Sequence, residues 1–418
     1  MSCSCCDRFG KTLHYVSPAH GGWGMVRIAA LIPESWQLFV APFACGRHGA
    51  LGGILNGVKD RISYLYIDEA DIVSGHYENL IPDAVDELFA AIPKKPKVLA
   101  VFVSCLDDLL GTDHVALNRL LSERHPDVRF VTCHMNPLKT DTPIPPGIGV
   151  QNSIYSLLDR QNEKVRAVNL IGNNAPLRKE CELFGFLEEH GIQVHHITDY
   201  AEFEKFQEMG KSSLNMVLSP TAVYASGLME ENLGIKALEA IHTYDLDEIA
   251  TRYDALAGHF GITLDYNAHR AEADAALKAA KDAVGDVPVA IDYQAVRKPF
   301  TLAKVLLQYG FNVRFLMTDG VKNVEKAAAE YVKANYPQVE IVNAVHHDMV
   351  NSPIRDGGYL CIGFDCAYAT GSDKVLNLME DEGLFGFDGV KELMRLLVEA
   401  NEAEADLKEI IEEAKLII

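Results

Sequence analysis

The chain has 418 residues, 48% of them hydrophobic and 23% charged, which is enough for two or three domains with substantial cores. Its formal net charge of -21, without a basic stripe, argues against nucleic-acid binding because a phosphate backbone would be repelled. No run of about 18 apolar residues marks a membrane span, and the polar start does not resemble a signal peptide. We therefore expect a cytoplasmic protein without a membrane or nucleic-acid partner.

Short apolar runs alternate with segments of helical periodicity along the whole chain, which is typical of parallel α/β units. The predicted strands form three groups, 37–41, 64–67, 98–103 and 128–132, then 165–171, 194–197 and 216–218, then 287–291, 313–316, 339–342 and 359–362. Strands that helices cover on both faces have continuous apolar sequences, as these do.

Two boundaries separate these groups. Residues 140–149 are rich in Pro and Gly and are predicted to be neither helix nor central strand. The second boundary lies near Gly285, after the segment 267–284, whose charges at helical spacing favour a solvated helix. We predict an α/β fold of three doubly wound, Rossmann-like domains with parallel sheets. These domains span 1–150, 151–285 and 286–418, and the last includes a C-terminal helical stretch from residue 390.

The nine cysteines include two that follow predicted strands of the first domain. An odd number without a secretion signal argues against a disulfide framework and leaves metal ligand, redox thiol or buried apolar filler. Cys45 follows the strand at 37–41 and Cys105 follows the strand at 98–103, and ligands of parallel sheets lie beyond such strand ends. A following helix would lower the thiol pKa and favour metal binding.

Neighbouring residues support a metal centre at this edge without excluding a plain turn with a buried cysteine. Gly46 and Gly49 would let the backbone approach a bulky ligand, and Ser104 directly precedes Cys105. Two thiolates are too few for a four-thiolate cluster, so a second subunit would supply the others. Position alone is not unique, because Cys133 also ends a predicted strand.

Other cysteines and histidines are weaker candidates. Cys3, Cys5 and Cys6 lie within four residues and form either a metal site or a reactive tail. Cys366 follows a third-domain strand, whereas Cys361 lies within that strand and is better explained as filler. Histidines near the candidate edge could relay protons to a reduced substrate, although exposed or hydrogen-bonded histidines are common; they are His48, His76 and His114.

Several segments resemble the nitrogenase component 1 type oxidoreductase family, in the order and spacing found there. They are 42–46 (PFACG), 66–75 (YIDEADIVSG), 103–112 (VSCLDDLLGT) and 385–389 (FGFDG). In that family the first and third carry cluster-ligating cysteines, which matches Cys45 and Cys105. The family includes nitrogenase, protochlorophyllide reductase and nickel-sirohydrochlorin reductive cyclase.

The resemblance implies a nitrogenase-like reductase subunit with an iron–sulfur cluster, 4Fe–4S or larger, at a subunit interface. The partner subunit would be a second copy or a paralogue. A separate ATP-hydrolysing iron protein would pass electrons to the cluster, for reduction of an organic or tetrapyrrole-like small molecule. Two alternatives stay open: a scaffold for assembly of a metallocluster or cofactor, and a small-molecule binding protein that has lost its metal.

Departures from the family pattern narrow these expectations. Nitrogenase has another interfacial cysteine where residues 17–24 (SPAHGGWG) have none, so His20, Cys3, Cys5 or Cys6 would have to replace it. Ser219 stands where nitrogenase has a cofactor-ligating Cys, and Leu384 or Phe385 where it has the cofactor His. The resemblance therefore implies no molybdenum–iron cofactor.

Overall fold

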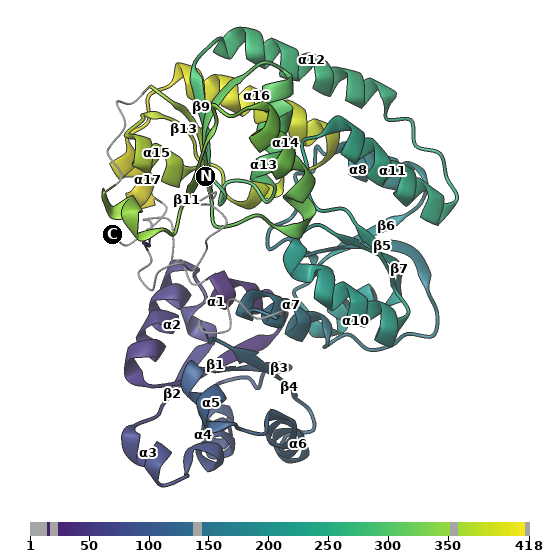
Figure 1. The fold of residues 1–418 in the computed structure, drawn as a ribbon. Coiled ribbons are helices and arrows are strands. Elements are labelled where there is room, and N and C mark those ends of the chain that lie inside the picture. The colour runs from purple at the N-terminus through teal and green to yellow at the C-terminus, as the bar shows by residue number, and fades with distance from the viewer. Residues whose placement is uncertain (1–14, 17–23, 137–143, 352–357, 414–418) are drawn as a thin grey trace. The chain divides into compact units, whose positions relative to one another are not determined.

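The computed structural model describes residues 15–16, 24–136, 144–351 and 358–413, which divide into two compact units. Unit 2 consists of Gly22–Asn174 and Gln193–Glu239, and unit 1 contains Ala175–Ile192 together with the chain from Ala240 onward. The secondary structure forms three separate parallel sheets (Figure 1). No helix among the described residues is long and apolar enough to cross a membrane.

The first sheet, in unit 2, has the strand order β2-β1-β3-β4. Its strands are β1 (Ser35–Ala41), β2 (Ile62–Tyr66), β3 (Val98–Val103) and β4 (Arg129–His134). Its helices are α1 (Gly24–Ala29), α2 (Phe43–Leu55), α3 (Glu69–Val73), α4 (Tyr77–Ala91), α5 (Cys105–Leu110), α6 (His114–Arg124) and α7 (Pro146–Tyr155). Phe39 lies in the core on one face of β1, while Leu38 and Val40 lie in the core on the other, so apolar layers cover both faces.

The second sheet, also in unit 2, has the order β6-β5-β7-β8. Its strands are β5 (Val165–Ile171), β6 (Gln193–His196), β7 (Ser212–Val217) and β8 (Lys236–Glu239), with the helices α9 (Phe203–Phe206) and α10 (Val223–Leu233). One apolar cluster runs from Phe39 and Phe102 of the first sheet to Ile171 and Val217 of the second. This shared core explains why the two sheets form one compact unit.

The third sheet, in unit 1, has the order β11-β10-β9-β12-β13. Its strands are β9 (Pro288–Ile291), β10 (Asn312–Thr318), β11 (Glu340–Asn343), β12 (Leu360–Ile362) and β13 (Lys374–Leu376). The helices of unit 1 are α8 (Glu182–Glu189), α11 (Leu246–Phe260), α12 (Asn267–Val284), α13 (Pro299–Gln308), α14 (Lys326–Asn335), α15 (Phe364–Thr370), α16 (Gly386–Glu402) and α17 (Leu407–Glu413).

The predicted α/β fold with three parallel sheets is confirmed, and each predicted strand group forms one sheet. Two short strands, β8 and β13, were not predicted. The expectation that 140–149 contains no helix was wrong in part, because α7 begins at Pro146. Proline is tolerated at the first helical position, where its missing N–H would have had no partner.

Helix α12 has the predicted limits, Asn267–Val284, but it is not the solvated helix that its charges suggested. Ala273, Leu277, Ala280 and Val284 form a buried stripe at helical spacing, and α12 packs against α16. The charged residues occupy the remaining faces. The alternating charges along α12 therefore gave no indication of its narrow apolar stripe of small residues and one leucine.

Candidate functional site

The strand order of the first sheet reverses between β1 and β3, which places its ligand-binding position at the ends of those two strands. The strands are parallel, and Val40 pairs with Val103 near their carboxyl ends. Cys45 is the third residue of α2, and Cys105 is the first residue of α5. The topology thus brings both predicted ligands to one edge, and we call them the thiol pair.

The thiol pair is close enough for its charges to interact. Burial and a negative charge on Cys105 both raise the pKa of the Cys45 thiol. Each cysteine is half-buried. The expectation of a helix-lowered pKa was therefore wrong for Cys45, because a neighbouring thiolate and partial burial oppose ionisation more than the helix end favours it. A bound cation would reverse this balance by pairing with both thiolates.

Ser104 is a buried polar group beside the thiol pair. It is the residue before α5, yet its side chain does not cap the helix. The side chain is 2% exposed, and its Oγ has no hydrogen-bond partner among the residues that the structure describes. A buried hydroxyl without a partner is unfavourable, so Oγ–H is suited to donate to a sulfur ligand at this edge. The residues present fit an iron–sulfur cluster in this respect.

Gly46 and Gly49 have a contact role that needs no cluster. A Cβ at Gly46 would lie 2.7 Å from Cε1 of Tyr66, and one at Gly49 would lie 3.1 Å from the Phe39 ring. Both glycines let α2 lie against aromatic side chains of β1 and β2. Their predicted contact with a cofactor stays a prediction.

Exposed apolar side chains lie on the two helices that carry the thiol pair and on the neighbouring elements β2 and α6. Phe43, two residues before Cys45, is 66% exposed, and its ring lies 5.1 Å from that of Tyr66 at the end of β2. Leu109 on α5 is 75% exposed, and Leu110 and Val115 are also exposed. We call these five residues the apolar rim. A concentration of large apolar side chains at one exposed edge is typical of a surface that another protein covers.

A polar cluster lies directly behind Cys105 on α5. The buried carboxylate of Asp107 accepts a hydrogen bond from Tyr77 Oη at 2.7 Å and lies 2.5 Å from Nε2 of His114. Burial raises the pKa of Asp107, but the hydrogen bonds from His114 and Tyr77 outweigh burial and hold it below its usual value. The rings of His114 and His134 meet edge to face at 5.0 Å.

Of the residues in this polar cluster, the sequence indicated only His114 as lying near this edge. Asp107 and Asp108 lie in the first turn of α5, where carboxylates commonly cap a helix, but Asp107 contacts Tyr77 of α4 and His114 of α6, and Asp108 contacts His134 and Asn136. His134 is the last residue of β4, and its position at a strand end was the signal that could have found it.

The other cysteines of the described structure are buried. Cys133 and Cys181 are buried thiols. Cys366, in unit 1, is fully buried, and its Sγ donates to the carbonyl oxygen of Gly363 at 3.2 Å. Cys361 lies within β12, as expected. The remaining candidates, Cys3, Cys5, Cys6 and His20, lie outside the described residues.

The corresponding position of the third sheet, between β9 and β12, holds two carboxylates. Asp292 follows β9 and Asp365 follows β12, and each is 1% exposed. Asp292 accepts backbone hydrogen bonds from Gln294 at 2.9 Å and from Asp365 at 2.8 Å, while Gln294 Nε2 donates to Asp365 at 2.6 Å. Burial, with the charge of Asp365, raises the pKa of Asp292 to about 7. We call these two residues the carboxylate pair.

At the edge of the second sheet, Ser219 has a local structural role. Its Oγ accepts a hydrogen bond from the backbone N–H of Thr221 at 3.4 Å. Gly172 has a φ of +93°, and a Cβ there would lie 3.0 Å from Cβ of Ser219. Ser219, just after β7, therefore packs closely against Gly172, just after β5, where glycine leaves room for it.

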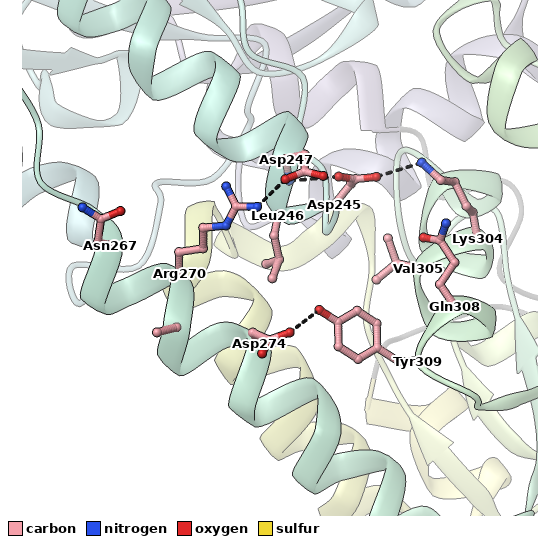
Figure 2. Close-up of a pocket in the computed structure, with 11 residues that line it drawn as sticks. Asp245, Leu246, Asp247, Asn267, Arg270, Asp274, Lys304, Val305, Gln308 and Tyr309 are labelled. Carbon is pink, nitrogen blue, oxygen red and sulfur yellow. Dashed lines mark hydrogen bonds and ion pairs between the residues drawn. The ribbon is translucent and has the colours of Figure 1, made fainter.

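Unit 1 also contains a polar cavity of about 530 Å³ between α11, α12 and α13 (Figure 2). Its charged groups pair with one another: Lys304 lies 2.9 Å from Asp245, Arg270 contacts Asp247, and Tyr309 donates to Asp274 at 2.6 Å. No sequence signal had indicated this cavity. Since the charged groups of this cavity already pair with one another, they do not indicate which ligand the cavity would bind.

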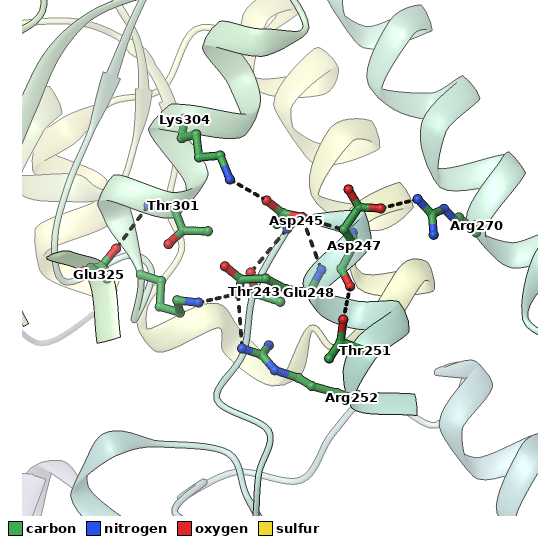
Figure 3. Close-up of polar contacts among 11 residues, drawn as sticks. Thr243, Asp245, Asp247, Glu248, Thr251, Arg252, Arg270, Thr301, Lys304 and Glu325 are labelled. Carbon is green, nitrogen blue, oxygen red and sulfur yellow. Dashed lines mark hydrogen bonds and ion pairs between the residues drawn. The ribbon is translucent and has the colours of Figure 1, made fainter. Parts of the chain in front are cut away.

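The polar contacts beside that cavity connect α11 with α13 (Figure 3). Glu248 accepts from Arg252 at 3.2 Å and from the buried Lys298 at 2.5 Å. Glu325 accepts from the backbone N–H groups of Phe300 and Thr301 at the start of α13. The buried charged groups Lys298 and Glu325 are therefore stabilised by hydrogen-bond partners within unit 1.

Comparisons with known proteins agree with this architecture. The solved structure "Nitrogenase Cp1 at pH 6.5" matches with a TM-score of 0.72 at 14% identity, covering 94% of this chain and 93% of that one. A second, "Nitrogenase Cp1 at pH 5", matches with a TM-score of 0.63 at 18% identity, covering 94% and 89%. These likenesses show the fold.

Sequence comparison gives the family. The nitrogenase iron–molybdenum cofactor biosynthesis protein NifE of Clostridium pasteurianum is 23% identical over 221 residues, which cover 49% of this chain and 45% of that protein. The match therefore spans about half the length of that relative. A family model described as nitrogenase component 1 type oxidoreductase matches residues 26–400. The chain belongs to the nitrogenase component 1 type oxidoreductase family.

Proposed function

We propose that this chain is a reductase subunit that holds an iron–sulfur cluster through Cys45 and Cys105 at a subunit interface. The observation that carries the proposal is the thiol pair itself: two half-buried thiols at the ends of adjacent strands, near enough for one to raise the pKa of the other. When bound, such a cluster supplies one-electron transfer at a potential set by hydrogen bonds to sulfur and by exposure.

The chain's own residues would provide the surroundings of that cluster. Ser104 would donate a hydrogen bond to sulfur from a buried hydroxyl. Phe43 and Leu109 of the apolar rim are exposed in the single chain. A partner that covers the rim would bury these side chains and exclude water from the cluster. Two thiolates leave a four-thiolate cluster under-ligated, so a second copy or a paralogous subunit would supply the remaining ligands.

Family membership supports a proposal for the electron source and the substrate. The donor would be a separate ATP-hydrolysing iron protein, and the net charge of -21 would favour approach of a basic face on a partner. The reduced substrate would be an organic or tetrapyrrole-like small molecule. By the family resemblance, Ser219 and either Leu384 or Phe385 stand at the positions where nitrogenase ligates its cofactor, so we propose no molybdenum–iron cofactor here.

A second candidate function is a scaffold on which a metallocluster or cofactor is assembled and then transferred. The partial match to NifE, a cofactor biosynthesis protein, favours it. Turnover separates the two functions. A reductase forms many equivalents of product per chain with the iron protein, ATP and reductant, whereas a scaffold releases about one equivalent of cargo.

The direct test is iron and sulfide analysis with electron paramagnetic resonance on anaerobically purified full-length protein, combined with measurement of its mass in solution. We expect cluster iron in the dimeric or heterodimeric fraction, because a monomer cannot complete the ligand set. Protein that holds no cluster after careful reconstitution would refute the proposal. A monomer with a stable cluster would refute the shared-interface part of it.

A further inference from the structure

We propose that Asp107, His114 and His134 form a second metal site, which takes one divalent transition-metal ion of the Zn²⁺ or Fe²⁺ type. We call these three residues the histidine–aspartate cluster. The site is separate from the thiol pair, although Asp107 lies on the same short helix as Cys105. The proposal does not depend on the function assigned to the thiol pair.

The fold assembles this cluster from three elements. Asp107 belongs to the first turn of α5, His114 is the first residue of α6, and His134 is the last residue of β4. One ligand atom from each residue lies within 4.8 Å of the other two. Because α5 and α6 follow β3, the neighbour of β4, the three side chains meet at the carboxyl edge of the sheet.

Charge balance points to a cation at this place. The Asp107 side chain is 1% exposed, and no described Lys or Arg forms an ion pair with it. Its contacts are the hydroxyl groups of Tyr77 and Thr112 and the His114 imidazole, and these groups are neutral unless the imidazole is protonated. A buried carboxylate needs a compensating positive charge. A divalent ion supplies that charge with both imidazoles in their neutral, metal-binding form.

A comparison with a similar group in unit 1 shows the difference. Glu182, His269 and Asp388 also place three ligand atoms within 4.8 Å. There Lys391 already lies 2.6 Å from Asp388, and backbone N–H groups at the start of α16 donate to Glu182. That group has its internal cation and its hydrogen bonds. The histidine–aspartate cluster has no such lysine, and Nδ1 of His114 is buried without a partner among the described residues.

The donor set indicates the class of metal. Two imidazoles and one carboxylate suit borderline ions such as Zn²⁺ and Fe²⁺, and three protein ligands leave a position for water or another ligand. Asp108 lies 3.2 Å from Nδ1 of His134, where it would orient that ring as an outer carboxylate. The gap of 2.5 Å between His114 and Asp107 would open to roughly 3 Å around an ion with bonds of about 2 Å.

The metal would fix the helix that carries Cys105. Helix α5 has only six residues, Cys105–Leu110, and ends at Gly111 in a left-handed conformation. So short a helix is not stable by itself and depends on its contacts. An ion that joins α5 to α6 and β4 would hold Asp107, and therefore Cys105, in place.

The test uses Zn²⁺ and Co²⁺ with the full-length protein in which Cys45, Cys105, Cys3, Cys5 and Cys6 are all replaced by alanine, so that neither the thiol pair nor the N-terminal cysteines can bind metal. We expect about one equivalent of tightly bound Zn²⁺, and a Co²⁺ spectrum without a thiolate-to-metal charge-transfer band. Asp107→Asn, His114→Gln and His134→Gln should each weaken Zn²⁺ binding by at least about tenfold. Zn²⁺ should raise the unfolding temperature of the parent and not that of these variants.

The matched control is His125→Gln. His125 directly follows α6, and its Nε2 lies 2.7 Å from Asp86, but it has no third ligand nearby in the described structure. It should bind Zn²⁺ as the parent does. Absence of Zn²⁺ binding, unchanged binding in the three variants, or a thiolate band in the Co²⁺ spectrum would each overturn the proposal. Each outcome leaves the proposed cluster at Cys45 and Cys105 untouched, since both cysteines are absent.

Discussion

The first and third sheets each place two acidic side chains at the same topological position, but the two pairs differ in burial and in hydrogen bonding. Cys45 and Cys105 follow β1 and β3, whereas Asp292 and Asp365 follow β9 and β12. The thiol pair is half-buried, and the apolar rim beside it is exposed. The carboxylate pair is buried, and backbone and side-chain groups of the same unit donate to it. The position thus permits a ligand site, but exposure and unsatisfied donors decide whether one exists.

Local backbone geometry makes the third-sheet edge compact. Gly363 has a φ of +106°, and a Cβ there would lie 2.5 Å from Cβ of Asp292. Asp292 accepts from the backbone N–H of Asp365 in the first turn of α15. The carboxylate therefore occupies the place at a helix start where a ligand anion would otherwise bind. At the first sheet, the residue before α5 is Ser104, whose side chain makes no capping hydrogen bond.

The largest expected difference between the two edges is in cluster iron. Cys45→Ala or Cys105→Ala should remove the cluster, whereas Cys133→Ala, Cys181→Ala and Cys366→Ala should retain it, because those three thiols are buried. Iron and sulfide content per chain, with the paramagnetic signal, measures this loss. A cluster that survives in the Cys45→Ala, Cys105→Ala double variant would place the ligands elsewhere. Cys3, Cys5 and Cys6 would then be tested next.

The next effect concerns packing at the third-sheet edge. Gly363→Ala should lower the free energy of unfolding by about 3 kcal/mol, because the new methyl group meets Asp292 in a backbone conformation that alanine rarely adopts. Chemical denaturation measures the change. Gly111→Ala is the matched control at the first sheet. Its φ is +73° with nothing within 4 Å of the added Cβ, so its cost should be only about 1 kcal/mol. Equal costs would show that crowding at Asp292 is unimportant.

A smaller effect should appear in the pH dependence of stability. The pKa of Asp292 is about 7 in the folded protein against an ordinary value of 3.8, so the folded state holds the proton more tightly. Its contribution to stability is present below pH 3.8 and is lost as pH rises through about 7. Each pKa unit corresponds to about 1.4 kcal/mol, so the loss is a few kcal/mol at most.

Asp365→Asn tests this contribution, because it removes the neighbouring charge and keeps an oxygen for Gln294. We expect the free energy of unfolding to fall less between pH 5 and pH 8 in the variant than in the parent. Denaturation curves at these two pH values decide the question. A variant with the same pH dependence as the parent would show that Asp365 does not raise the pKa of Asp292.

The sequence predicted the three sheets and the position of the thiol pair, because strand ends of a parallel sheet share one edge. It did not predict β8 or β13, which are short edge strands that each begin with an exposed or half-exposed lysine and lack a long apolar run. It also did not predict the contacts of Asp107, because a position in the first turn of a helix is local information. Its partners Tyr77 and His114 come from other elements, and single-sequence patterns do not report such contacts.

The substitution with the smallest expected effect on folding should have a clear effect on assembly. Leu109 is 75% exposed on α5, so Leu109→Gln should change the free energy of unfolding of the single chain by less than about 0.5 kcal/mol. If a partner subunit covers the apolar rim, the same change should weaken association by at least about tenfold, because a buried leucine would be replaced by an amide without partners. Sedimentation at several protein concentrations, with iron content measured in each fraction, reports both quantities.

The matched control is Val223→Gln, which changes a residue 42% exposed at the start of α10, away from the first-sheet edge. It should alter neither association nor cluster retention. If Val223→Gln weakens association and Leu109→Gln does not, the subunit interface lies on another surface. The contrast between an open thiol edge and a closed carboxylate edge would then reflect solvent exposure alone and not the presence of a partner.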